Sequence, residues 1–200
     1  MEISSDQVKQ LRDKTGAGMM DCKKALAESG GNFEKAIDYL RKKGAATAEK
    51  RADRATNQGL IEAYIHAGGR MGAMVEVNCE TDFVAKTDDF KSLVKDISMQ
   101  VAAMNPKYIG REDVSKEGID HELEIYRDQA RNEKKPEQVI ERIALGKLEK
   151  FFQESCLLEQ TFIRDSGKTI KDLILDMTAK TGEKISIRRL KRFHLGENEI

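Results

Sequence analysis

The spacing of apolar residues changes at Gly59 from the helical period of about 3.6 residues to the two-residue period of β-strands. After this point the segments LIEAYIH (60–66) and MGAMVEVN (71–78) flank a glycine-containing turn, which predicts a β-hairpin. Helical spacing then returns. Two periods mixed in this way predict an α+β fold, with an antiparallel or mixed sheet flanked by helices.

Residues 1–44 carry the pattern of three short helices. Ser4 begins a Ser-x-x-Gln capping box, which predicts the first helix start. Asn32 can cap the third helix, and Gly44 is expected to end it. The first 44 residues are therefore expected to form a three-helix domain.

The polar stretch 45–58 lacks apolar periodicity and is interpreted as a linker or a frayed helical extension. Residues 59–200 are expected to form the α+β core. The pattern predicts the following core elements after the hairpin: helices over 83–104, 119–133 and 137–154, a strand over 156–164, a helix over 169–180 and a strand over 184–195.

Charge and cysteine content exclude several classes of protein. Lys+Arg and Asp+Glu balance at 35 each, so the whole-chain charge gives no reason to expect nucleic acid as a partner. No apolar run approaches the roughly 20 residues of a membrane helix, and the start has no signal-peptide pattern. No membrane partner is therefore expected. Cys22, Cys79 and Cys156 have neither zinc-site nor disulfide-framework spacing, which favours a cytoplasmic protein.

No motif for catalysis, metal or cofactor binding is complete. The segment SGKT (166–169) resembles the end of a phosphate-binding loop, but Phe162 stands where that loop needs its first glycine. His66, His121 and His194 lie in three different predicted elements, away from other ligands at metal-site spacing. We therefore expect no catalytic residue, no metal and no cofactor, and we expect that the protein is not an enzyme.

The segment NCETDFVAK (78–86) places an aromatic residue where capping residues start a helix. Thr81 or Asp82 can cap that helix, which leaves Phe83 in its first turn, before the regular apolar stripe that begins near Phe90. From the residues alone two interpretations stay open. Phe83 is either a core residue turned inward or a side chain held out for a partner.

Four segments resemble the bacterial elongation factor Ts family, the guanine-nucleotide exchange factors for elongation factor Tu. LRDKTGAGMMDCKKAL (11–26) and NCETDFVAKTDDF (78–90) are similar to its two signatures. LLEQTFIRD (157–165) and ISIRRLKRFHLGE (185–197) are similar to the strands that close its core. The resemblance implies an N-terminal domain like the ubiquitin-associated (UBA) domain, followed by an α+β core.

The chain is shorter than many members of that family. Longer members carry an extra core subdomain and a helical coiled-coil hairpin, for which 200 residues leave no room. The chain is similar to the short class, of which some members form homodimers, so a homodimer is an expected partner state.

The resemblance also implies a partner and a site. The partner is elongation factor Tu, GDP-bound and nucleotide-free, whose Mg²⁺ and phosphate site is disturbed so that GDP leaves and GTP replaces it. The resemblance implies two sets of residues. The segment that disturbs the Mg²⁺ site of the partner, called the lever below, is Thr81, Asp82, Phe83 and Val84. The contacts with the nucleotide-binding domain of the partner are Arg12, Met19, Met20 and Lys23. Because Met19 and Met20 are adjacent, both can hardly be buried in so small a domain.

The alternative function is an RNA-binding adaptor of the translation machinery. Its candidate residues are Lys50, Arg51, Arg54 and the basic run 188–192. Alternation along a strand places the side chains of that run on two opposite faces, and the balanced net charge of the chain argues against RNA binding. No direct contact with nucleic acid is expected.

Overall fold

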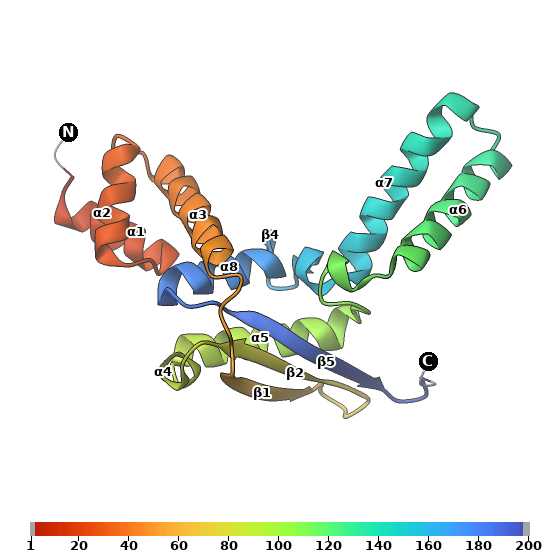
Figure 1. Ribbon diagram of the computed structural model, residues 1–200. Helices are drawn as coiled ribbons and strands as arrows, with labels where there is room; N and C mark the ends of the chain where they lie inside the picture. Colours follow the sequence, from red (N-terminus) through yellow and green to blue (C-terminus); the bar gives the residue numbers. More distant parts are fainter. Residues whose placement is uncertain (1–2, 198–200) are drawn as a thin grey trace. The chain divides into compact units, whose positions relative to one another are not determined.

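The computed structural model describes residues 3–197 and shows an α+β protein (Figure 1). The chain divides into two compact units. The first contains the residues up to 62 together with 76–96 and 171–188, and the second contains 63–75, 97–170 and the residues from 189 on. The mixed helix and strand content confirms the fold class expected from the sequence.

Three helices form at the N-terminus: α1 (Ser5–Thr15), α2 (Met19–Glu28) and α3 (Phe33–Lys50). The predicted capping box at Ser4 is present, and the Asn32 side chain accepts a hydrogen bond from the Lys35 N–H at 3.0 Å. These helices enclose a small apolar core of Val8, Leu11, Ala17, Cys22, Ala25, Leu26, Ala36 and Leu40. A UBA-like arrangement of the three stays a prediction.

The expectation that Gly44 ends the third helix is wrong, because α3 continues to Lys50. Gly44 is buried inside the helix and lies against α8 (Ile170–Thr181). A Cβ added there would lie 3.2 Å from the Ala179 Cβ and 3.3 Å from the Leu175 carbonyl oxygen. Gly44 therefore permits close packing of two helices instead of stopping one. The domain boundary at residue 44 and a separate linker over 45–58 remain predictions.

The predicted hairpin is confirmed as β1 (Gln58–Ile65) and β2 (Met71–Cys79). The predicted C-terminal strand is β5 (Ser186–His194), which completes a sheet of order β1-β2-β5 (Figure 1). The backbone N–H of Leu195, just after β5, donates to the carbonyl of Arg70, just before β2, at 2.8 Å. The end of β5 thus meets the start of β2, so the two strands are antiparallel.

The single helix expected over 83–104 is divided. A four-residue helix, α4 (Asp82–Ala85), precedes α5 (Asp88–Met104). Thr87 stands between them, and its hydroxyl oxygen accepts from the Phe90 N–H at 3.3 Å, which starts the second helix. Phe83 consequently lies on a short helix of its own.

In the second unit, α6 (Lys116–Asn132) and α7 (Glu137–Ser155) form a helical hairpin (Figure 1). Arg127 of α6 and Glu141 of α7 are joined by a two-pronged ion pair with distances of 2.8 and 2.9 Å. Both helices were predicted, but the expectation that the chain has no room for a helical hairpin is wrong.

The expectation of a continuous strand over 156–164 is also wrong. A 3₁₀ turn over Leu157–Glu159 precedes the short strand β3 (Thr161–Phe162), which pairs antiparallel with β4 (Asp165–Thr169). The turn buries Gln160, whose side-chain amide accepts from Gln100 at 3.1 Å and donates to a backbone carbonyl at 2.7 Å. These partners lie outside the apolar pattern, which therefore could not reveal the break.

Candidate functional site

Phe83 is exposed over 79% of its surface, the largest exposed fraction among the described large apolar side chains. Its position on α4 explains this exposure. Ala85, at the end of the helix, is buried, and at 3.6 residues per turn a side chain two positions earlier points about 200° away from it. The interpretation of Phe83 as an inward core residue is therefore wrong, and its interpretation as an outward side chain fits.

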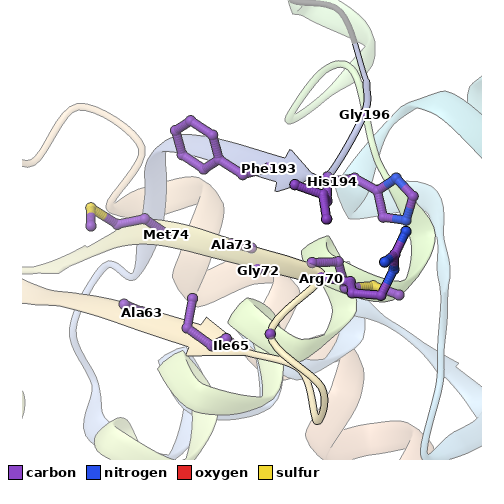
Figure 2. A pocket seen from close by; sticks show the side chains of 12 residues that line it. Ala63, Ile65, Arg70, Gly72, Ala73, Met74, Phe193, His194 and Gly196 are labelled. Atoms are coloured by element: carbon purple, nitrogen blue, oxygen red, sulfur yellow. The ribbon is translucent and has the colours of Figure 1, made fainter.

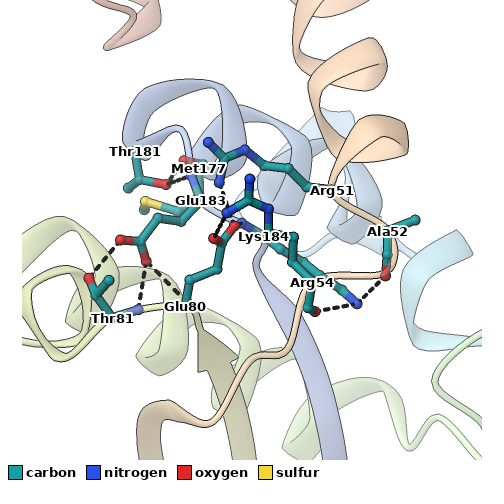
Figure 3. Close-up of polar contacts among 9 residues, drawn as sticks. All are labelled: Arg51, Ala52, Arg54, Glu80, Thr81, Met177, Thr181, Glu183 and Lys184. Carbon is teal, nitrogen blue, oxygen red and sulfur yellow. Dashed lines mark hydrogen bonds and ion pairs between the residues drawn. The ribbon is translucent and has the colours of Figure 1, made fainter.

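Thr81 is the N-cap of α4, as the sequence allowed. Its hydroxyl oxygen accepts a hydrogen bond from the Val84 N–H at 3.4 Å. The same hydroxyl donates to the carboxylate of Glu183 at 2.6 Å (Figure 3). Both hydrogen bonds of the Thr81 hydroxyl are thus made within the chain, and they support the helix that carries Phe83. Val84, the last of the four implied residues, is half-buried.

Asp82 lies beside Phe83 and keeps 48% of its side chain exposed. The Lys86 ammonium donates to this carboxylate at 2.6 Å, one helical turn away. That hydrogen bond is the main reason that the pKa of Asp82 is lowered. The exposed tip of α4 therefore presents an aromatic ring next to a charged carboxylate.

The predicted N-terminal contact residues lie on both sides of the turn between α1 and α2. Met19 and Met20 are 44% and 75% exposed. Their adjacency predicted only that both could not be buried, and in the structure neither is. Arg12 and Lys23 are exposed as well. The inward positions of α2 are taken by Cys22, Ala25 and Leu26. All four residues belong to the first compact unit, which also contains α4.

Several of the cations proposed for RNA binding have partners within the chain. Arg51 donates to the Glu80 carboxylate at 2.7 Å, and Arg54 lies 3.5 Å from its other oxygen. Arg192 donates to the Ala102 carbonyl at 2.9 Å and to Glu197 at 2.8 Å. These contacts reduce the charge available for phosphates. Nothing in the described residues favours the RNA-binding alternative.

Sequence reasoning missed Glu80 and Glu183. The pKa of Glu80 is lowered, first because the Lys184 backbone N–H donates to its carboxylate at 2.7 Å and then because Arg51 pairs with it. Glu183 accepts hydrogen bonds from residues about a hundred positions away. No local pattern marks either glutamate among the 35 acids of the chain.

A shallow apolar hollow lies in the second unit, where β1, β2 and β5 present exposed side chains (Figure 2). Ile65, Met74 and Phe193 are 67%, 50% and 59% exposed, and Arg70 and His194 also line it. Within residues 3–197, no cluster of His, Cys, Asp and Glu could hold a metal ion. In the same part of the chain, no helix is long and apolar enough to span a membrane.

Comparisons with known proteins identify the family of the chain. A family model described as elongation factor Ts matches residues 2–197. Elongation factor Ts of Caldanaerobacter subterraneus subsp. tengcongensis is 62% identical over 195 residues, with 98% of each chain covered. The proteins of the same name from Moorella thermoacetica and Thermotoga neapolitana are 60% and 58% identical, with 98–99% of each chain covered. The match spans both the N-terminal helices and the segment that exposes Phe83, so the chain belongs to the elongation factor Ts family of translation elongation factors.

Proposed function

We propose that this protein acts in the cytoplasm as a guanine-nucleotide exchange factor, which binds elongation factor Tu and promotes release of its GDP. The observation that carries the proposal is Phe83, an aromatic side chain that is 79% exposed at the tip of an anchored short helix. Large exposed aromatic side chains are characteristic anchors of protein interfaces. The action is conformational, so the protein needs no catalytic residue and is not an enzyme in this proposal.

The mechanism follows from thermodynamic linkage. A factor that binds nucleotide-free elongation factor Tu more tightly than the GDP-bound form must weaken GDP binding by the same ratio. Mg²⁺ tolerates little distortion of its octahedral ligand shell. A Phe83 ring inserted between partner helices would therefore loosen Mg²⁺ and GDP without touching the nucleotide.

The N-terminal residues supply a second contact in this proposal. Met19 and Met20 expose flexible, polarisable side chains that adapt to a partner surface. Arg12 and Lys23 add positive charge beside them. We propose that these four side chains bind the nucleotide-binding domain, while α4 acts on the GDP site.

The decisive experiment follows fluorescent GDP as it leaves elongation factor Tu. Adding this protein should accelerate the release, and the rate should saturate as its concentration rises. The isolated protein should bind neither GDP nor zinc, when these are tested by calorimetry and elemental analysis. An unchanged release rate across the concentration series would contradict the proposal.

We also propose a homodimer formed through the apolar hollow around Ile65, Met74 and Phe193. A two-fold interface brings a patch against its own copy, and an uncharged apolar centre can do so without repulsion. Phe193→Lys would place two new charges at that interface. Sedimentation should therefore give a dimer mass for the wild type and a monomer mass for this variant.

The control for the dimer is Leu145→Lys, at an apolar residue of α7 that is 49% exposed and does not line the hollow. It should leave the mass unchanged. A monomeric wild-type protein at micromolar concentration would refute the dimer and leave the exchange proposal intact.

A further inference from the structure

A carboxylate from a distant part of the chain holds the backbone that leads into α4. One oxygen of Glu183 accepts hydrogen bonds from the backbone N–H groups of Glu80 and Thr81, at 3.1 and 3.0 Å. The other oxygen accepts the Thr81 hydroxyl at 2.6 Å (Figure 3). Hydrogen bonds to an ionised acceptor are stronger than neutral ones. Three donors from two adjacent residues therefore converge on one side chain.

The Thr81 hydroxyl links Glu183 to the helix. It donates a hydrogen bond to the Glu183 carboxylate, and its oxygen accepts one from the Val84 N–H. With four residues, α4 makes about one turn, which is too short to be stable by itself. The orientation of Phe83 thus depends on contacts outside α4.

Glu183 itself has little freedom. It directly follows Gly182, which ends α8 in the left-handed conformation at φ 70° and donates its N–H to the Thr178 carbonyl at 2.9 Å. The Glu183 N–H donates to the Thr181 hydroxyl oxygen at 3.2 Å. The carboxylate is consequently carried by the fixed end of a regular helix.

The contact between the two chain segments is reciprocal. Glu183 accepts from the backbone at Glu80, while the Glu80 carboxylate accepts from the backbone N–H of Lys184 at 2.7 Å. Arg51, just after α3, donates to the same Glu80 oxygen at 2.7 Å (Figure 3). The two glutamates therefore tie the start of α4 to the start of β5 in both directions.

We propose that Glu183 is a positioning residue, which fixes α4 in the free protein so that Phe83 is presented in one orientation. Ordering a mobile segment at the moment of binding reduces affinity, whereas a preordered side chain avoids that loss. The consequence for GDP release rests on the exchange function proposed above. The orientation itself does not, and it can be measured on the isolated protein.

A spectroscopic reporter can be placed at the site, because the chain contains no tryptophan. Phe83→Trp gives a single tryptophan, on the exposed side of α4, whose emission can be excited selectively over that of the four tyrosines. Side-chain and loop motions on the picosecond-to-nanosecond scale depolarise such an emitter. Time-resolved anisotropy of this variant should show mainly the slow tumbling of the whole protein, with a small fast component.

Removing the carboxylate should free the reporter. In the Phe83→Trp background, Glu183→Ala should enlarge the fast component. Glu183→Gln should give a smaller increase, since the amide oxygen can still accept the two backbone bonds but the amide nitrogen cannot accept the Thr81 hydroxyl. The Gln variant also serves if the Ala variant does not fold. An unchanged fast component in a folded Glu183 variant would overturn the proposal.

Glu141→Ala is the matched control, because it removes a glutamate that pairs with Arg127 on the α6–α7 hairpin. It should leave the reporter unchanged, and a comparable increase there would also overturn the assignment. In the exchange assay, Glu183→Ala should slow GDP release by roughly fivefold with Phe83 present and by little with Phe83→Ala.

The two proposals fail in different ways. If Phe83→Ala alone leaves GDP release unchanged, the exchange function proposed for Phe83 fails, whatever the reporter shows. If Phe83→Ala slows release but Glu183→Ala slows it equally in both backgrounds, Glu183 does not act through Phe83. The positioning role of Glu183 is then refuted, whereas the role of Phe83 in GDP release is retained.

Discussion

Phe83→Ala should reduce the maximal rate of GDP release from elongation factor Tu by roughly tenfold or more, since losing about 1.4 kcal/mol of differential binding has that effect. The side chain is 79% exposed, so its removal should change the free energy of unfolding by no more than about 0.5 kcal/mol. A buried phenylalanine would instead lose about 3–5 kcal/mol. Urea denaturation and fluorescent-GDP release on the same preparation measure the two effects.

Leu145→Ala is a suitable control for that experiment, because Leu145 is also exposed, at 49%, but lies in the other compact unit and outside the proposed dimer interface. It should leave the maximal release rate unchanged. If Phe83→Ala exchanged GDP as fast as the wild type, Asp82 would be the remaining candidate for the lever.

The features that could be predicted from the sequence are those determined by neighbouring residues. The capping residues Ser4 and Asn32, the hairpin at 60–78 and most helix positions follow from short-range patterns, and the structure confirms them. The place of Phe83 in the first turn of a helix could be predicted for the same reason, but the residues alone left open whether its side chain is buried or exposed. Phe83 precedes the regular apolar stripe of α5, and a capping residue two positions earlier fixes its place in the first turn.

The features that escaped prediction depend on residues far away in the sequence. Gly44 continues a helix because α8 packs against it, and only the folded structure brings the two together. The clamp of Glu183 on Thr81 spans 102 residues. The break between α4 and α5 is an intermediate case. Thr87 could be identified as a second cap, but the apolar pattern continues past it.

The N-terminal contacts should affect a different kinetic quantity from the one that Phe83 affects. Met20→Ala combined with Lys23→Ala should raise the concentration needed for half-maximal exchange by roughly tenfold, which corresponds to about 1.4 kcal/mol of binding. Met20 is 75% exposed and Lys23 lies one turn further along the same helix, so both can be removed without disturbing the core of the domain.

Lys24→Ala is the matched control for this variant, because it removes the same charge from the next position of α2, about 100° around the helix. It should leave the half-maximal concentration nearly unchanged. The maximal rate should stay close to that of the wild type in both variants, since in our proposal the N-terminal residues bind and Phe83 acts on the GDP site. If Met20 and Lys23 make the proposed binding contact, the half-maximal concentration must rise while the maximal rate stays unchanged. A lower maximal rate with an unchanged half-maximal concentration would instead place these residues in the lever and remove the division of roles.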